Sequence, residues 1–174
     1  QSDVDMAGFR DDVTAPIPVA DIFQDTYLDL YILPSSTLKN PQSHHLYMRD
    51  GVVLKERDQL GQGFLVALDA LYQQGPAGLT RQELQARYLW AQKMVGRAKQ
   101  ADVEGLYRAH WLKTDLLPDY FAVRQKWYDG SKGSLRWLCH NDEEAYQLFK
   151  TVFETVWDNA TMANVIQKVY EQTD

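Results

Sequence analysis

The chain is poor in the residues and motifs that most metal, redox and hydrolytic sites need. Its 174 residues include one cysteine, Cys139, which excludes an internal disulfide and a zinc site built from several cysteines of this chain. The sequence has neither the Gly-x-Ser-x-Gly pattern of serine hydrolases nor the Gly-Lys-Ser/Thr of phosphate-binding loops. No apolar run approaches the roughly 20 residues that span a bilayer, so we expect a soluble protein.

The four histidines lack the spacing of a metal site. His44 and His45 are adjacent, so their side chains point in opposite directions in an extended segment. His140 precedes an expected helix start and therefore does not share a helical face with Glu143. His110 lies on the aromatic face of a predicted helix, which is typical of an interior or boundary histidine. We expect no metal and no cofactor.

Cys139 is the one candidate nucleophile that the sequence offers. It ends the apolar run 135–139, which is typical of a buried structural thiol. Neighbouring side chains rarely converge, so a catalytic partner would have to be a histidine other than His140, brought close by the fold. A non-catalytic protein is favoured, and an enzyme using Cys139 or a histidine is an alternative.

Apolar residues recur at steps of three and four over most of the chain, which predicts amphipathic helices. Two of them, within residues 58–72 and 80–99, are expected to pack together as a helical hairpin that frames the fold. Thr80 and Glu83 predict a capping box at the start of the second helix. Between the two, Gly75 fits the left-handed residue just past a helix end. Further helices are predicted over residues 22–33, 103–113, 118–128, 142–157 and 161–170.

The remaining segments show no helical pattern. Residues 1–18 lack periodicity and contain two prolines, so we expect an extended or mobile arm. Residues 46–55 hold two short β-prone runs around an Asp-Gly dipeptide, which suits a type I′ turn and predicts a small β-hairpin. The predicted fold class is therefore all-α. A single-domain bundle of about six to seven helices would occupy residues 19–174.

Charge is distributed unevenly around a formal net charge of −6. Residues 1–30 hold seven acidic residues against one arginine, and residues 138–174 hold seven against two lysines. Residues 87–137 hold ten lysines and arginines against five acidic residues, and they are also rich in aromatic rings. An acidic head and an acidic tail thus flank a basic-aromatic region, residues 87–137.

The aromatic residues of the basic-aromatic region fall into two groups. Three fit the apolar stripes of predicted helices and are expected in the core: Tyr88, Tyr107 and Trp111. Three fit those stripes less well and are expected to be exposed: Trp90, Trp127 and Trp137. Trp, Tyr and Arg dominate binding hot spots because their side chains bury a large rigid area and still carry a polar group that can form a hydrogen bond. The predicted binding residues are Trp90, Arg97, Arg108, Lys113, Arg124, Trp127, Lys132, Arg136 and Trp137.

These features predict a non-catalytic macromolecular interaction module, such as an accessory, adaptor or inhibitor subunit. We expect an acidic protein partner to bind the basic-aromatic region, with the cations steering the encounter. Nucleic acid bound by the same surface is the main alternative. The small polar start Gln1-Ser2-Asp3 is compatible with removal of a signal peptide, which favours a bacterial periplasmic or secreted protein over a cytoplasmic one. The oligomeric state is left open.

Overall fold

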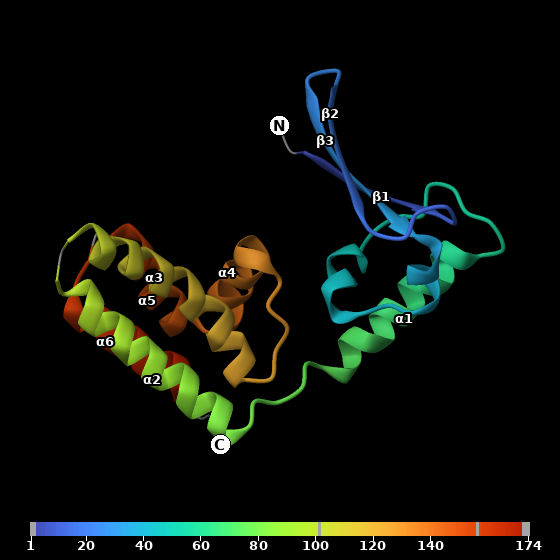
Figure 1. Ribbon diagram of the computed structural model, residues 1–174. Helices are drawn as coiled ribbons and strands as arrows, with labels where there is room; N and C mark the ends of the chain where they lie inside the picture. Colours follow the sequence, from blue (N-terminus) through green and yellow to red (C-terminus); the bar gives the residue numbers. More distant parts are fainter. Residues whose placement is uncertain (1–2, 101, 156, 172–174) are drawn as a thin grey trace. The chain divides into compact units, whose positions relative to one another are not determined.

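The computed structural model describes residues 3–100, 102–155 and 157–171 and is mostly helical, with a small three-stranded sheet (Figure 1). The chain divides into two compact units, Gln1–Gln74 and Gly75–Asp174. The helical class is thus confirmed, whereas the predicted hairpin at residues 46–55 is wrong because the sheet is mixed and lies earlier in the chain. None of the described helices is both long enough and apolar enough to cross a membrane.

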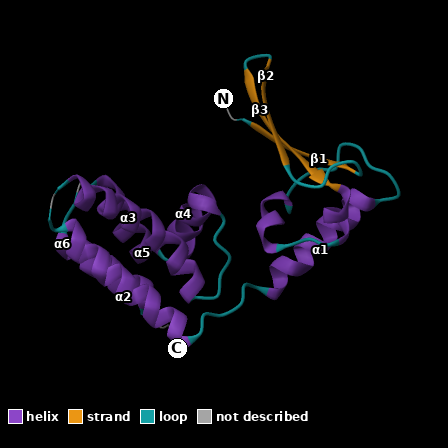
Figure 2. Cartoon of the chain, in the orientation of Figure 1, coloured by secondary structure: helices purple, strands orange, loops and turns teal. Residues whose placement is uncertain are grey.

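The sheet belongs to the N-terminal unit and consists of β1 (Val4–Arg10), β2 (Ile17–Phe23) and β3 (Thr26–Pro34) (Figure 2). β3 is central: it pairs in parallel with β1 and antiparallel with β2. Gln24 and Asp25 join β2 to β3, and both have positive φ, as a two-residue type I′ turn requires.

The sheet takes up residues that were predicted to form an arm and a helix. Residues 4–10 of the expected extended or mobile arm, 1–18, form strand β1, and residue 19 lies inside β2. The predicted helix over residues 22–33 is instead the end of β2 and most of β3. Apolar residues alternate there with period two as well as recurring at helical spacing, so the local pattern does not decide between the two structures. Pairing on both sides of β3 decides in favour of the strand.

The rest of the N-terminal unit is formed by two short 3-10 helices, η1 (Ser35–Lys39) and η2 (Ser43–Met48), and by α1 (Leu60–Gln74). Residues 49–59 contain neither helix nor strand, and Val52 and Leu54 are 83% and 80% exposed. This unit has a small core around Phe64 of α1. The Phe64 ring contacts Phe9 of β1 edge to face, with a distance of 5.6 Å between ring centroids.

The C-terminal unit contains α2 (Arg81–Ala98), α3 (Val103–Val123), α4 (Gly130–Asn141), α5 (Glu143–Glu154) and α6 (Asn159–Tyr170). The capping box of Thr80 and Glu83 is confirmed, and so is the left-handed Gly75, with φ of 73°. α2 packs against α3 and α6 within this unit, while α1 packs against η1 and η2 in the other. The predicted helical hairpin frame is therefore wrong, because its two helices belong to different units.

α3 runs without a break through Pro118, where two separate helices were predicted. A proline inside a helix removes one backbone hydrogen bond and costs about 3 kcal/mol. The residues on both sides of Pro118 are buried, and the contacts of this core offset that cost. No helix was predicted from the sequence between residues 128 and 142, whereas α4 begins at Gly130. The largest fully buried side chains of the core are Leu112, Leu116, Leu117, Tyr120, Leu138, Phe149, Val152, Met162, Val165, Ile166 and Val169.

A buried carboxylate ties three helices of the C-terminal unit together. Asp119 of α3 is 6% exposed and accepts hydrogen bonds from Arg87 of α2 and from the hydroxyl of Tyr170 of α6. Burial, and then this hydrogen bond, raises the pKa of Tyr170, so the phenol stays protonated and donates. The charge of Asp119 is therefore matched inside the fold.

Candidate functional site

α3 has two apolar faces, and only one of them is used by the core. The inward face carries Gly105, Ala109, Leu112 and Leu116, all of which are buried. Gly105 lets α2 approach closely: a Cβ added there would lie 2.9 Å from the carbonyl oxygen of Arg97. The small residues of this face thus select α2 as the neighbour of α3.

The other apolar face of α3 is exposed to solvent. Its residues follow helical spacing, with Val103 86%, Leu106 44%, Tyr107 63% and Trp111 40% exposed. His110 on the same face is exposed too. Tyr107 and Trp111 were predicted to be core, and this prediction is wrong because α2 occupies the opposite face. An amphipathic stripe that a helix would ordinarily bury is left open here.

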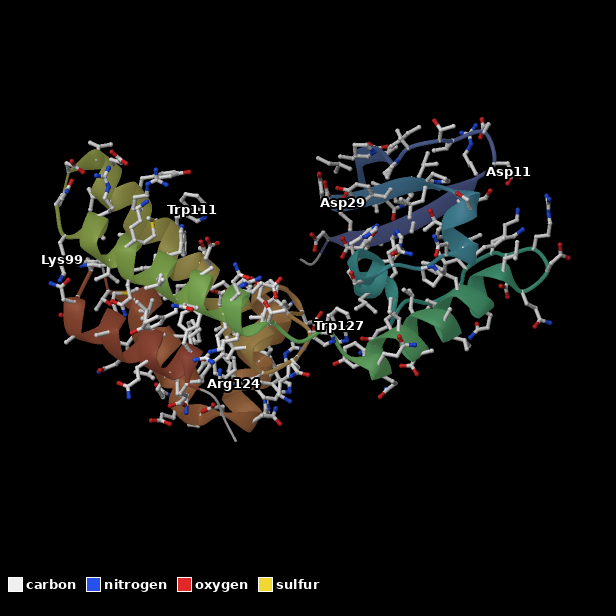
Figure 3. The ribbon with its side chains drawn as sticks, turned by 60° about the horizontal axis from the view of Figure 1, so that its bottom comes forward. Asp11, Asp29, Lys99, Trp111, Arg124 and Trp127 are labelled. Carbon is white, nitrogen blue, oxygen red and sulfur yellow. The ribbon has the colours of Figure 1, made fainter. Side chains whose placement is uncertain are left out.

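Four side chains form the centre of this surface, which we call the aromatic patch: Trp90 of α2 with Tyr107, Arg108 and Trp111 of α3 (Figure 3 labels Trp111). The rings of Trp90 and Trp111 meet edge to face, with centroids 5.7 Å apart, and the centroids of Tyr107 and Trp111 are 6.2 Å apart. The guanidinium carbon of Arg108 lies 5.2 Å from the Trp111 ring centroid, within cation–π range. The patch therefore combines rigid rings with a cation held over them.

Charged side chains continue the aromatic patch toward the turn between α2 and α3. Arg97 pairs with Glu104 at 2.6 Å, and Arg108 approaches the same carboxylate at 3.6 Å. The hydrogen bond from Arg97 holds the pKa of Glu104 below its usual value, so this carboxylate stays ionised. Lys93 lies three residues from Trp90 and four from Arg97, on the same side of α2. Three cations and one carboxylate thus border the rings.

Two of the predicted binding residues point inward instead. Lys113 is 5% exposed and donates to the backbone carbonyl of Thr155, and burial lowers its pKa. The guanidinium of Arg124 donates to the carbonyls of Lys168 at 2.8 Å and Val169 at 3.0 Å, and it covers the Tyr120 ring at 3.8 Å. Both cations satisfy carbonyls at helix ends. Their contacts are structural.

The remaining predicted site residues lie around α4 and the loop before it. Trp137 is half-buried, with its ring 5.5 Å from Phe121 and the Lys126 ammonium 5.0 Å from its ring centroid. Trp127 is also half-buried, and Lys132 and Arg136 are exposed on α4. The structure therefore brings Trp90, Arg97 and Arg108 together at the aromatic patch and leaves these four residues elsewhere in the same unit. Leu106, Tyr107 and Trp111 were missed by the sequence analysis, although the two apolar faces of α3 were a signal for them.

The residues of the catalytic alternative, Cys139 and the neighbouring His140, lie on α4. Cys139 is an exposed free thiol on α4, so the prediction of a buried structural thiol is wrong. The neighbouring His140 ring lies with Nδ1 2.7 Å from the carbonyl oxygen of Arg136. Within the described ranges, no group of three or more His, Cys, Asp or Glu side chains could hold a metal ion.

No protein-family model, no curated protein and no solved structure matches the chain. A functional argument for this chain therefore depends on the chemistry of its own surfaces.

Proposed function

We propose that this chain is a non-catalytic interaction module, an accessory, adaptor or inhibitor subunit, that binds an acidic protein partner through the aromatic patch. The observation that carries the proposal is the exposed stripe of α3, where Leu106, Tyr107 and Trp111 lie in the open on a helix whose opposite face is buried. Keeping such rings in water is unfavourable unless a partner covers them.

The composition of the patch supports a protein partner. Trp, Tyr and Arg are enriched in the hot spots of protein interfaces, where they fill pockets and exclude water. Trp90 packs against both the core and Trp111, so the fold already restrains the exposed ring of Trp111. Less side-chain entropy is then lost on binding. Lys93, Arg97 and Arg108 around the rings favour an acidic surface on the partner.

The state of the arginines at and around the aromatic patch disfavours nucleic acid as the ligand of that patch. Binding to a phosphate backbone needs several cations that are free to neutralise phosphates. Lys113 and Arg124 are buried, and Arg87, Arg97 and Arg108 share carboxylates of the same chain. At the aromatic patch itself, Arg97 and Arg108 share the carboxylate of Glu104, so this surface suits a partner that is held mainly by its apolar contacts.

The test compares the wild-type chain with a Tyr107→Ala, Trp111→Ala double variant, both immobilised and exposed to extract from the organism that encodes the chain. Retained proteins are identified by mass spectrometry, and the affinity for each is then measured with purified components. We expect the double variant to weaken binding of the true partner at least 30-fold, about the size of one 2 kcal/mol hot spot. Tyr128→Ala is the matched control, because Tyr128 is as exposed as Trp111 (42% against 40%) and lies beyond the opposite end of α3.

Three outcomes would contradict the proposal. The first is a set of retained proteins that the double variant binds as tightly as the wild type. The second is an equal loss of affinity in Tyr128→Ala. The third is retention of nucleic acid alone, with an affinity that falls steeply as salt is added.

A further inference from the structure

The N-terminal unit contains an open groove with a volume of about 1280 Å³, along strand β1. Every residue from Asp5 to Asp12 lines it, and so does every residue from 50 to 57. Side chains of a strand alternate between its two faces, so consecutive residues border one groove only where the groove follows the edge of the strand. Leu60, Phe64 and Leu65 of α1 also line the groove.

The edge of β1 that borders this groove has no strand beside it. The sheet order is β1-β3-β2, so β1 and β2 are the outer strands, and no described strand pairs with the far side of β1. Edge strands usually carry features that prevent pairing with another chain. β2 contains Pro18, which removes a backbone donor, whereas β1 (Val4–Arg10) contains no proline. The edge of β1 is therefore available for a further strand.

Two carboxylates in the groove lie side by side without a cation. Asp5 of β1 and Asp29 of β3 are register partners, on strands that lie about 4.8 Å apart, so their side chains leave the same face of the sheet. Among the described residues, no lysine or arginine pairs with either of them. Two other groove carboxylates do pair with a cation: Asp12 with Arg10 and Asp50 with Arg49. The lining as a whole remains acidic, because its six carboxylates exceed its three cations, Arg10, Lys55 and Arg57. Figure 3 labels Asp29 and, apart from it, Asp11, which follows β1.

The walls around these carboxylates are apolar and aromatic. Val52, Leu54, Tyr31 and Tyr47 line the groove, and Val52 and Leu54 are more than three-quarters exposed. Tyr47 lines the groove together with Asp5 and Asp29, and partial burial, then Tyr31, and then Asp29 with Asp5 raise the pKa of Tyr47. The groove is larger than the roughly 300–1,000 Å³ of most small-molecule pockets and is open along its length.

We propose that this groove binds an extended peptide segment of a partner protein that carries lysine or arginine, and that the segment adds to β1 as a fourth strand. Backbone hydrogen bonds to the free edge of β1 would hold the segment, as in other cases of strand addition. Its cationic side chains would pair with Asp5 and Asp29, and its apolar side chains would contact Val52 and Leu54. This site is separate from the aromatic patch and does not depend on the function proposed for it.

The test titrates the full chain with three synthetic peptides and follows backbone amide shifts by NMR. The first is acetyl-Thr-Lys-Val-Lys-Thr-amide. The second replaces both lysines by glutamate. The third keeps the lysines but carries N-methyl groups on alternate backbone amides, which removes donors and blocks strand pairing. We expect the lysine peptide to shift the amides of β1 and to bind at least tenfold more tightly than either of the other two.

Variants of the carboxylate pair complete the test. The double variant Asp5→Asn, Asp29→Asn should weaken the lysine peptide about tenfold, while the exposed control Asp69→Asn on α1 should leave its affinity unchanged. Equal binding of the lysine and glutamate peptides would overturn the proposal, even if the double variant fails to fold. If the N-methylated peptide binds as tightly as the lysine peptide, the segment does not bind by strand addition. If the chain dimerises through β1 and the lysine peptide does not reverse the dimerisation, the edge binds a second copy of the chain and the proposal is wrong.

Discussion

Among single residues, His45 shows how burial turns a titratable group into a pH-dependent part of the fold. It is 8% exposed, its ring contacts Phe64, and its Nδ1 accepts a hydrogen bond of 2.9 Å from the backbone N–H of Gln42. Burial, and then the charge of His44, lowers the pKa of His45 below the ordinary 6.5. The native state therefore favours the neutral ring.

The consequence is a loss of stability in mild acid. Below pH 6.5 the unfolded chain takes up a proton that the native state resists, so the free energy of unfolding of the N-terminal unit should fall as the pH is lowered from about 7 to about 5. Above pH 7 this contribution should be constant. Proton NMR of the His45 ring should give a pKa below 6.5, and His45→Gln should flatten the pH dependence. A ring that titrates at or above 6.5 would contradict this prediction.

For the helices as elements, the packing of α2 against α3 depends on one glycine. Arg97 pairs with Glu104 near the turn, and Trp90 meets Trp111 further along, so the two helices run antiparallel. At Gly105 their backbones come close enough that a methyl group would press on the carbonyl of Arg97. This close approach could not be predicted from the sequence, because the apolar pattern of one helix does not show how near the next helix lies.

Two glycine substitutions separate helix propensity from packing. Gly96→Ala in α2 has open space for its Cβ, so it should stabilise the C-terminal unit by up to about 1 kcal/mol. Gly105→Ala gains the same propensity but forces α2 and α3 apart, and it should destabilise the unit by about 1–3 kcal/mol. Urea unfolding of both variants measures the difference. Stabilisation by both substitutions would show that the contact at Gly105 is looser than described.

At the scale of the whole molecule, the chain divides at the loop that the sequence marks with Gly75 and Pro76. The C-terminal unit, Gly75–Asp174, has its own core from α2 to α6, and the carboxylate of Asp119 is matched within it. The N-terminal unit is smaller, and its sheet leaves Ile22 and Phe23 exposed. The stability of the two units should therefore differ.

A fragment of residues 75–174 should fold without the N-terminal unit. We expect it to retain helical circular dichroism, a dispersed NMR spectrum and a single cooperative urea transition, since about 100 residues can bury an adequate core. Residues 1–74 alone should be only marginally stable. A non-cooperative transition of the 75–174 fragment would indicate that the chain folds as one domain, as the sequence analysis predicted.

The sequence by itself determined the features that a few neighbouring residues control. The capping box of Thr80 and Glu83 and the cap at Asp102 were predictable, because each is a bond between a side chain and a backbone group three residues away. The positive φ of Gly75 was predictable because glycine has no Cβ that would disfavour it. The helices after residue 142 were predicted for a similar reason, since each has one unbroken apolar stripe.

Tertiary structure alone decided the features for which the local sequence fits two different structures. Residues 22–33 satisfy both a helical and a strand pattern, and pairing with β1 and β2 made them strand. α3 is apolar on two faces, and the approach of α2 at Gly105 determined that Tyr107 and Trp111 face the solvent. Local chemistry is equally compatible with either outcome in both cases, because the deciding energy comes from contacts between different helices or strands.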